Sequence, residues 1–337
     1  RIIIAKKIFK YINQLFFLFG ILLFVYMLQN VGLAELWLKT KEMGWRILII
    51  IGITGLGLVF QAYAWWHCID HTRSKARLSD IVMTHISGWA VAEIAPLSNA
   101  AGEAFKGVMI RNHLEKSTVY SSLLLMNTIH TLVTFKIIAI GVVLTLFMIT
   151  VSLGMKILSI SIAVFMLFIV LLLISRQSKG MVTGIIKFFM RFKLFKSKFE
   201  TKLERAQEID KELSHFWKNK KKNFGMAYLM IWLGKIAGIM ELFLILKFLN
   251  YPQSFLTASY LFILLSVIFI AMFFVPSQIG VTEGGLNRAF KMLDMNPDYG
   301  TLLGIFRRIR VIVWIGLGLL LILISEMIWK RRRNSQL

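Results

Sequence analysis

Ionisable residues interrupt the long apolar stretches of this sequence, and their types indicate the chemistry they could do. Two glutamates each follow a proline at the same spacing, Glu103 after Pro96 and Glu283 after Pro276. A carboxylate in apolar surroundings can bind a cationic group or carry a proton. Basic and imidazole side chains stand in the same or neighbouring segments: Lys106, His130, Lys136, Arg307, Arg308 and Arg310. Because such cations bind phosphate and other anions, the pattern indicates a site for an anionic group flanked by acids.

The sequence leaves two interpretations of the glutamates open. In the first, Lys106, Arg308 and Arg310 bind the anion, while Glu103 and Glu283 select a cationic portion or carry a proton. In the second, the glutamates form ion pairs with nearby bases and only fix the local structure. A charged group inside a membrane costs about 2.5–3.5 kcal/mol on insertion scales. Under either interpretation we expect each charge to meet a partner or a wet cavity.

The composition assigns the chain to the membrane proteins. Of its 337 residues, 57% are hydrophobic and 17% are charged, against about 45–50% and 25% in soluble domains. A single cysteine, Cys68, excludes a disulfide framework, and the histidines have no metal-ligand spacing, so we expect neither metal nor cofactor. The net charge of +23 lies in basic runs between apolar segments. Basic runs between membrane segments set which loops face the cytoplasm and contact anionic lipid. We therefore do not interpret the charge as a nucleic-acid binding surface.

Six apolar runs are long enough to cross about 30 Å of hydrocarbon, which takes some 20 helical residues. They lie at about 9–29, 46–66, 119–149, 156–175, 224–248 and 300–329. Basic residues gather before the first run, after the second and after the last, and in the segment 176–222. By the positive-inside rule these regions, and with them both termini, are cytoplasmic.

Two further stretches, 78–112 and 256–294, each contain an apolar arm, a proline and glycine break, and a short amphipathic arm. We interpret both as re-entrant hairpins, and we expect each second arm to begin at its glutamate. Irregular backbone at membrane depth needs a protein or water-lined interior, so each break predicts a polar cavity. The break residues are Pro96 and Gly102 in the first hairpin and Pro276 and Gly280 in the second.

The segment 176–222 is predicted to be a basic, helical element at the cytoplasmic surface. Its apolar residues recur at helical spacing opposite lysines and arginines, as in helices that rest on anionic headgroups. A plain connector that fixes topology and a regulatory or partner-binding element remain alternatives.

An internal repeat relates the two halves of the chain, at about 46–149 and 226–329. An offset of 180 residues places Glu103 over Glu283 and His130 over Arg310. Three predicted crossings separate corresponding points, so the halves are inverted and the hairpins enter from opposite sides. Inverted repeats with broken helices are common in secondary transporters. We expect Glu103 and Glu283 to meet Arg310 and His130 near the middle of the bilayer.

The hairpin motifs, GEAFK at 102–106 after Pro96 and GVTEGG at 280–285 after Pro276, resemble the paired signatures of a known family. It is the lysylphosphatidylglycerol synthase transmembrane (flippase-like) family, which includes the flippase portion of the multiple peptide resistance factor. The resemblance implies a protein that moves a polar-headed lipid between leaflets. It also implies that Glu103, Glu283 and Arg310 line the path.

The sequence departs from this family in two respects. Asn127 and His130 stand where the family usually has an arginine in the third crossing. The soluble aminoacyl-transferase domain of the bifunctional members is not in the sequence, so synthesis of aminoacyl lipids is not expected.

The composition, the apolar runs and the internal repeat together predict an all-α polytopic protein, with residues 1–337 as a single integral membrane domain of six transmembrane helices and two oppositely inserted re-entrant hairpins. We expect a lipid flippase or transporter of the bacterial inner membrane, not an enzyme, whose partner is a phospholipid or lipid-linked substrate. The predicted substrate-binding residues are Glu103, Lys106, His130, Glu283, Arg308 and Arg310. The alternatives are a lipid-modifying enzyme that uses Glu103, Glu283 and His130 as acid and base, and an interaction scaffold built around 176–222.

Overall fold

The computed structural model describes residues 37–38, 41–71, 74, 76–95, 98–111, 113–148, 180–190, 203–251, 253–271 and 281–334, together with positions 157, 160, 161, 164, 165 and 168. Regular structure in these ranges is helical, which confirms the all-α class for them, and one isolated β-bridge joins Ser74 to Leu114. The chain divides into two compact units. Arg1–Leu58, Met83–Lys106 and Ala237–Leu337 form the first, and Val59–Val82 and Gly107–Ile236 form the second.

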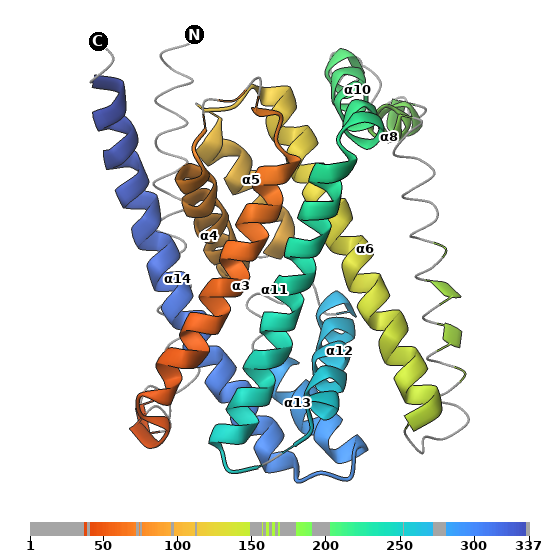
Figure 1. Ribbon diagram of the computed structural model, residues 1–337, viewed down its shortest axis with the longest axis vertical. Helices are drawn as coiled ribbons and strands as arrows, with labels where there is room; N and C mark the ends of the chain where they lie inside the picture. The colour runs from red at the N-terminus through yellow and green to blue at the C-terminus, as the bar shows by residue number, and fades with distance from the viewer. Residues whose placement is uncertain are drawn as a thin grey trace. The chain divides into compact units, whose positions relative to one another are not determined.

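The helices of the described part are labelled in Figure 1. They are α3 (Arg46–Cys68), α4 (Leu78–Ile94), α5 (Ser98–Ile110), α6 (Lys116–Met148), α8 (Met181–Met190), α10 (Leu203–Asn219), α11 (Lys221–Phe248), α12 (Phe255–Ala271), α13 (Val281–Met292) and α14 (Pro297–Asn334). Helices α3, α6, α11 and α14 are long and apolar enough to cross a membrane. They confirm the apolar runs predicted to cross at 46–66, 119–149, 224–248 and 300–329. The run at 9–29, and most of the run at 156–175, lie outside the described residues.

Local sequence chemistry sets the turn between α11 and α12. After α11 the chain passes through Asn250 at φ 55°, a left-handed conformation that asparagine tolerates. The Tyr251 N–H then donates to the carbonyl of Leu246 at 3.0 Å, which satisfies a free carbonyl at the helix end. Ser254 accepts from the Thr257 N–H at 3.1 Å and so caps the start of α12.

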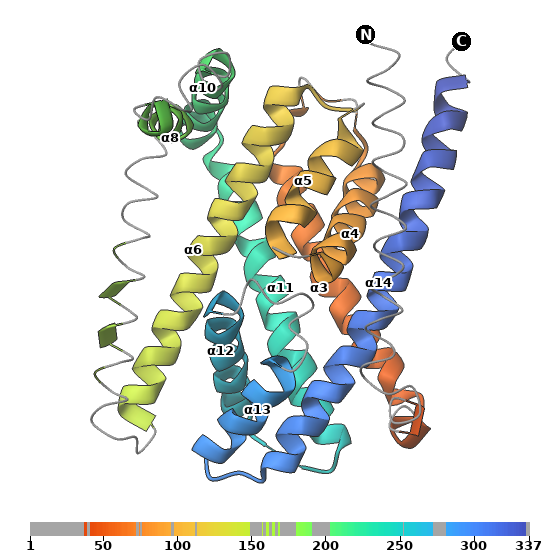
Figure 2. The same cartoon turned by 180° about the vertical axis from the view of Figure 1, so that it is seen from behind.

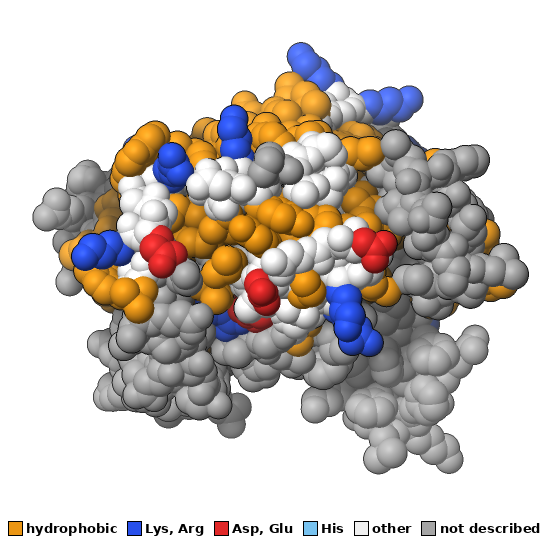
Figure 3. All heavy atoms as spheres, turned by 90° about the horizontal axis from the view of Figure 1, so that it is seen from below, with side chains coloured by type: hydrophobic (Ala, Val, Ile, Leu, Met, Phe, Trp, Pro, Cys, Tyr) orange, Lys and Arg blue, Asp and Glu red, His pale blue; other side chains and the backbone are white. Residues whose placement is uncertain are grey.

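The core of the first unit is apolar and is built from α3, α11, α12, α13 and α14. Its buried side chains are Met43, Ile47, Ile50, Leu242, Ile245, Leu246, Ala258, Leu261, Leu265, Leu286, Ala289, Phe290, Leu303, Phe306 and Ile309. Burial of such side chains is the main favourable term that holds these helices together. Figure 3 shows one end of the molecule, where acidic and basic side chains are scattered singly over a mostly apolar surface.

Helices α13 and α14 are joined by the short turn 293–296 and lie close to α12 (Figures 1 and 2). A Cβ atom at Gly285 of α13 would lie 2.9 Å from Cδ1 of Ile268 on α12, so these two helices pack closely. A Cβ atom at Gly300 of α14 would lie 2.7 Å from the carbonyl oxygen of Leu286 on α13. Glycine at both positions therefore permits α13 to pack between its neighbours. The predicted break residues Pro276 and Gly280 lie outside the described residues.

Helices α4 and α5, which lie largely in the first unit, pack as a helical hairpin over the stretch 78–112, whose re-entrant insertion stays a prediction. A Cβ atom at Gly102 of α5 would lie 2.6 Å from Cβ of Ala92 and 2.6 Å from the carbonyl oxygen of Gly88, both on α4. A Cβ atom at Gly88 would in turn lie 2.3 Å from Cγ of Lys106, so α4 residues 88 and 92 lie near α5 residues 106 and 102, as in antiparallel packing. Pro96 lies outside the described residues, and α5 begins at Ser98. The prediction that this arm begins at its glutamate is therefore wrong for Glu103.

In the second unit, polar contacts join α10 to its neighbours. The Ser121 hydroxyl of α6 donates to the Glu212 carboxylate of α10. Lys220, directly after α10, lies 2.9 Å from Oδ1 of Asp70. Figure 2 shows α8 and α10 side by side. Helical structure in the basic segment 176–222 is thus confirmed over α8 and α10.

Candidate functional site

A glutamate and two arginines form a buried ionic cluster between α11 and α14 in the first unit. Glu241 on α11 is only 2% exposed, and Arg307 and Arg310 on α14 are also buried. The Nε atoms of Arg310 and Arg307 lie 2.8 and 3.1 Å from Oε1 of Glu241. One carboxylate oxygen therefore accepts hydrogen bonds from two guanidinium groups, and both bonds are charge-assisted.

Helix α3 supplies a further polar contact to this carboxylate. Oγ1 of Thr54 lies 3.4 Å from Oε2 of Glu241 and 3.0 Å from the carbonyl oxygen of Ile50, one turn earlier. A hydroxyl has one hydrogen, so it donates to one of these oxygens at a time. Both oxygens of Glu241 thus have polar neighbours, and three helices meet at this residue.

Arg308 pairs with the glutamate of the second predicted hairpin. Its Nε donates to Oε1 of Glu283 at 2.6 Å, and its Nη2 contacts the same oxygen. Glu283 lies in the first turn of α13, as predicted, where the helix dipole favours an acid. A Cβ atom at Gly304 of α14 would lie 2.9 Å from Cγ of Glu283 and 3.1 Å from its Cα. Because glycine has no side chain, position 304 lets α13 come close enough to α14 for Glu283 to pair with Arg308.

Glu93 on α4 is the third carboxylate near these bases. It interacts electrostatically with Arg310, Arg307 and Arg308. A buried charge left without a partner is strongly destabilising, and Glu241 and Glu283 give all three arginines an ion-pair partner.

One donor of the cluster remains unused within the described part of the chain. Nη1 of Arg307 is buried and has no hydrogen-bond partner there. The guanidinium carbon of Arg307 lies 5.6 Å from the ring centroid of Phe269, a cation–π contact. The arrangement leaves an N–H available to an additional acceptor.

The described residues give the matched glutamates and Arg310 the following ion-pair partners. Arg310 contacts Glu241, whereas Glu283 contacts Arg308. Glu103 pairs within its own helix, with Nζ of Lys106 2.7 Å from its Oε1. The local pairing of Glu103 favours the interpretation in which this acid fixes the hairpin.

Lys106 is held in place by the hairpin itself. It is 5% exposed, and its stem covers Gly88 of α4, where any side chain would collide with it. Its ammonium group faces Glu103, whose Oε2 is buried without a hydrogen-bond partner among the residues described. Lys106 therefore supports the α4–α5 packing through both its stem and its charge.

His130 and Asn127 lie on α6 in the second unit, whereas Arg310 lies in the first. His130 is half-buried and Asn127 is exposed. The carbonyl oxygen of His130 accepts a hydrogen bond from the Thr134 hydroxyl at 2.8 Å. The predicted role of His130 in substrate binding stays a prediction.

Two charged residues outside the predicted substrate-binding set are Glu241 and Lys235, both on α11. Glu241 is the shared partner of two arginines, and Lys235 is an ammonium group near the middle of the same spanning helix. The sequence marks Glu241 as a charge within the fifth predicted crossing, whereas Lys235, a charge in the same apolar run, was missed.

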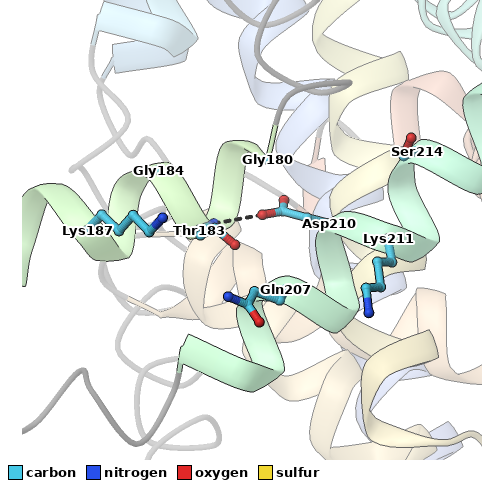
Figure 4. A pocket seen from close by; sticks show the side chains of 8 residues that line it. All are labelled: Gly180, Thr183, Gly184, Lys187, Gln207, Asp210, Lys211 and Ser214. Atoms are coloured by element: carbon cyan, nitrogen blue, oxygen red, sulfur yellow. Dashed lines mark hydrogen bonds between the residues drawn. The ribbon is translucent and has the colours of Figure 1, made fainter.

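The second unit contains an open pocket of about 460 Å³ between α8 and α10 (Figure 4). The two carboxylate oxygens of Asp210 accept hydrogen bonds from the N–H groups of Val182 and Thr183 at 3.0 and 2.8 Å. Asp210 therefore caps α8 from the neighbouring helix. Lys187 and Lys211 are the basic side chains of the pocket lining.

Spanning helices that carry buried ion pairs define the class of this protein as an all-helical, multi-pass membrane protein. Within the described residues, no group of His, Cys, Asp and Glu is arranged to hold a metal ion. A family model for the lysylphosphatidylglycerol synthase TM region matches residues 13–323. The chain belongs to that family, as its hairpin motifs indicate, and membership implies membrane-lipid substrates. No curated protein and no solved structure matches the chain.

Proposed function

We propose that this protein moves a phosphate-bearing lipid between the two leaflets of the bacterial inner membrane. The observation that carries the proposal is the cluster of three arginines and three glutamates, because four of these charges project from helices long enough to cross the bilayer. Charges in such helices usually face a partner, a substrate or an ion pathway. Family membership adds that the substrate is a membrane lipid.

We further propose that six crossings surround two re-entrant hairpins, α4–α5 and α12–α13, inserted from opposite sides and related by the inverted repeat. The close packing of α5 on α4 and of α13 on α12 supports the hairpins. The shared proline–glutamate spacing at Pro96 and Pro276 supports the repeat. The basic segment 176–222 and both termini would lie on the cytoplasmic side, in contact with anionic headgroups.

In the proposed mechanism, a lipid phosphate competes with the carboxylates for the arginines. A phosphate oxygen would accept from Nη1 of Arg307 and would displace Glu283 from Arg308. Because Glu283 lies in the first turn of α13, its release would free that helix to move. Headgroup binding would in this way couple to a change in the hairpin, while the acyl chains stay in the lipid. Glu103, Lys106 and His130 remain predicted residues of the path.

A transfer assay with labelled lipid tests the proposal. Full-length protein is reconstituted in liposomes that contain fluorescent phosphatidylglycerol, and the fraction open to a membrane-impermeant quencher is followed over time. We expect Glu283→Gln to slow transfer at least about tenfold, since the neutral amide loses its ionic contact with Arg308. The matched control is Glu326→Gln, which removes an exposed acid from the other end of α14.

The alternatives give different results in the same experiment. A lipid-modifying enzyme would yield a new lipid product by mass spectrometry. An interaction scaffold would show no transfer, and only deletions within 176–222 would change its cellular effect. Either outcome would overturn the transport proposal.

A further inference from the structure

The spanning helices carry more basic groups than their carboxylates can neutralise. Away from the helix ends, the four spanning helices contain one carboxylate, Glu241. Their lysines and arginines in the same interior positions are Lys136, Lys235, Arg307, Arg308 and Arg310. The three arginines form ion pairs with Glu241 and with Glu283 from α13, and Glu93 from α4 interacts with them electrostatically. Of these five bases, Lys136 on α6 and Lys235 on α11 are the two that take no part in these contacts.

Neither lysine has a carboxylate partner in the described part of the structure. Nζ of Lys136 instead lies 5.0 Å from the ring centroid of Tyr228 on α11. Only two acids of the sequence, Glu35 and Glu200, fall outside the described residues, and both stand outside the predicted apolar runs. Among the described residues, therefore, neither ammonium group has a carboxylate counter-ion.

The two lysines belong to the same unit and are related through Tyr228. Lys235 follows Tyr228 by seven residues on α11, which places the two side chains about 20° apart around the helix and about 10 Å apart along it. Lys136 contacts that same tyrosine from α6. Lys136, Tyr228 and Lys235 therefore follow one face of α11 toward its middle.

The neighbours of these lysines are apolar and exposed. On α11, Leu229 and Ile236 are 49% and 42% exposed, and on α6 Ile140, one turn after Lys136, is 48% exposed. Exposed apolar surface on a spanning helix suits acyl chains rather than water. A ligand that meets both the ammonium groups and this surface has an anionic head and hydrocarbon tails.

We propose that Lys136 and Lys235, with Tyr228 between them, bind the phosphate of a lipid headgroup and select lipids of net negative charge. The inference rests on the proposed transport function and specifies its substrate class. A phosphodiester supplies the counter-charge that the chain lacks, whereas an aminoacylated headgroup brings its own ammonium group. That second cation would be repelled by uncompensated lysines in a medium of low dielectric constant. The substrate is therefore an anionic phospholipid rather than an aminoacylated one.

The test combines binding and transfer for three labelled lipids: phosphatidylglycerol, zwitterionic phosphatidylcholine and net-positive lysylphosphatidylglycerol. Binding is measured on the detergent-purified full chain, and transfer is measured in liposomes. We expect phosphatidylglycerol to bind most tightly and lysylphosphatidylglycerol least tightly. We expect Lys235→Gln and Lys136→Gln each to weaken phosphatidylglycerol binding about tenfold, because each removes one charge-assisted contact.

Two further variants separate loss of charge from loss of fold. Lys235→Arg keeps the positive charge and should retain the preference for phosphatidylglycerol. Lys247→Gln removes an exposed lysine at the far end of α11 and should leave binding unchanged.

Equal or tighter binding of lysylphosphatidylglycerol, or wild-type phosphatidylglycerol binding by both glutamine variants, would overturn the inference. Lysine-dependent binding of phosphatidylglycerol without any transfer would support the inference and overturn the transport function. Transfer that prefers lysylphosphatidylglycerol would support transport and overturn the inference. The two proposals therefore fail in distinguishable ways.

Discussion

Arg310 of α14 donates a hydrogen bond to Glu241 of α11, a residue 69 positions earlier in the sequence. The same carboxylate oxygen accepts from Arg307. Because one acid serves two buried guanidinium groups, we expect the packing of α11 on α14 to depend more on Glu241 than on either arginine.

Glu241→Gln should therefore destabilise the protein by about 3–5 kcal/mol, the usual consequence of removing one partner from a buried ion pair. The amide leaves two guanidinium groups without a counter-charge in an apolar surrounding. Thermal unfolding of the purified protein in detergent measures the change. Glu326→Gln, at an exposed position of α14, should unfold at the wild-type temperature.

Replacing Glu241, Arg307 and Arg310 together by apolar residues tests whether unpaired charge causes the destabilisation expected for Glu241→Gln. The triple variant Glu241→Met, Arg307→Met and Arg310→Met removes Glu241 together with both arginines that it binds and leaves the Glu283–Arg308 pair in place. Buried ionic groups replaced together by apolar residues are often tolerated, so this variant should be more stable than Glu241→Gln. If it is less stable, loss of packing rather than loss of charge explains the effect of the single change.

Gly304→Ala should force α13 away from α14 and weaken the contact between Glu283 and Arg308. A Cβ atom at 304 would lie 3.1 Å from the backbone Cα of Glu283, which a rotamer change cannot relieve. We expect a loss of about 1–3 kcal/mol, as for other overpacked sites, together with slower lipid transfer. Gly316→Ala on the same helix is the control, since its Cβ atom would meet nothing within 4 Å. Equal effects of the two variants would contradict this explanation.

Asp210→Asn should loosen α8 without affecting the spanning helices. The carboxylate caps α8 through the N–H groups of Val182 and Thr183, and loss of a helix cap costs about 1 kcal/mol. Hydrogen exchange of the α8 amides should accelerate several-fold, while exchange in α11 stays at the wild-type rate. The exposed Glu208 of α10 provides the matched variant, Glu208→Gln, in which α8 should exchange as in the wild type.

The pKa of His71, which follows α3, is lowered from its usual value of 6.5 chiefly by burial, although its hydrogen bond to the Trp66 carbonyl acts in the opposite direction. The folded protein therefore binds this proton less tightly than the unfolded chain does. As the pH falls below about 6.5, the unfolded chain takes up a proton at His71 more readily than the folded protein does. The free energy of unfolding therefore decreases with falling pH. Between about pH 8 and about pH 5, His71→Gln should lose less thermal stability than the wild type. A His71→Gln variant that loses as much as the wild type, or as much as the control His215→Gln, would contradict this assignment.

The sequence determined the elements that depend on local composition. The crossings that the structure describes agree with the apolar runs because a run of about 20 such residues has few stable alternatives to a helix that crosses a membrane. The α4–α5 hairpin was foreseen because proline and glycine interrupt the apolar pattern. The start of α5 was placed too late, since the residues from Ser98 onward carry no signal as strong as the glutamate itself.

Only the tertiary structure decided which charges meet. The sequence named Glu283, Arg308 and Arg310, but the partner of an arginine depends on how α14 is rotated and on which helix packs against it. Glu241 became the shared partner because α3 and α11 bring Thr54 and that carboxylate to the same face of α14. Apolarity is a property of each segment alone, whereas an ion pair is a property of two segments and the angle between them. For that reason, the sequence could supply the charges of this protein but could not assign their partners.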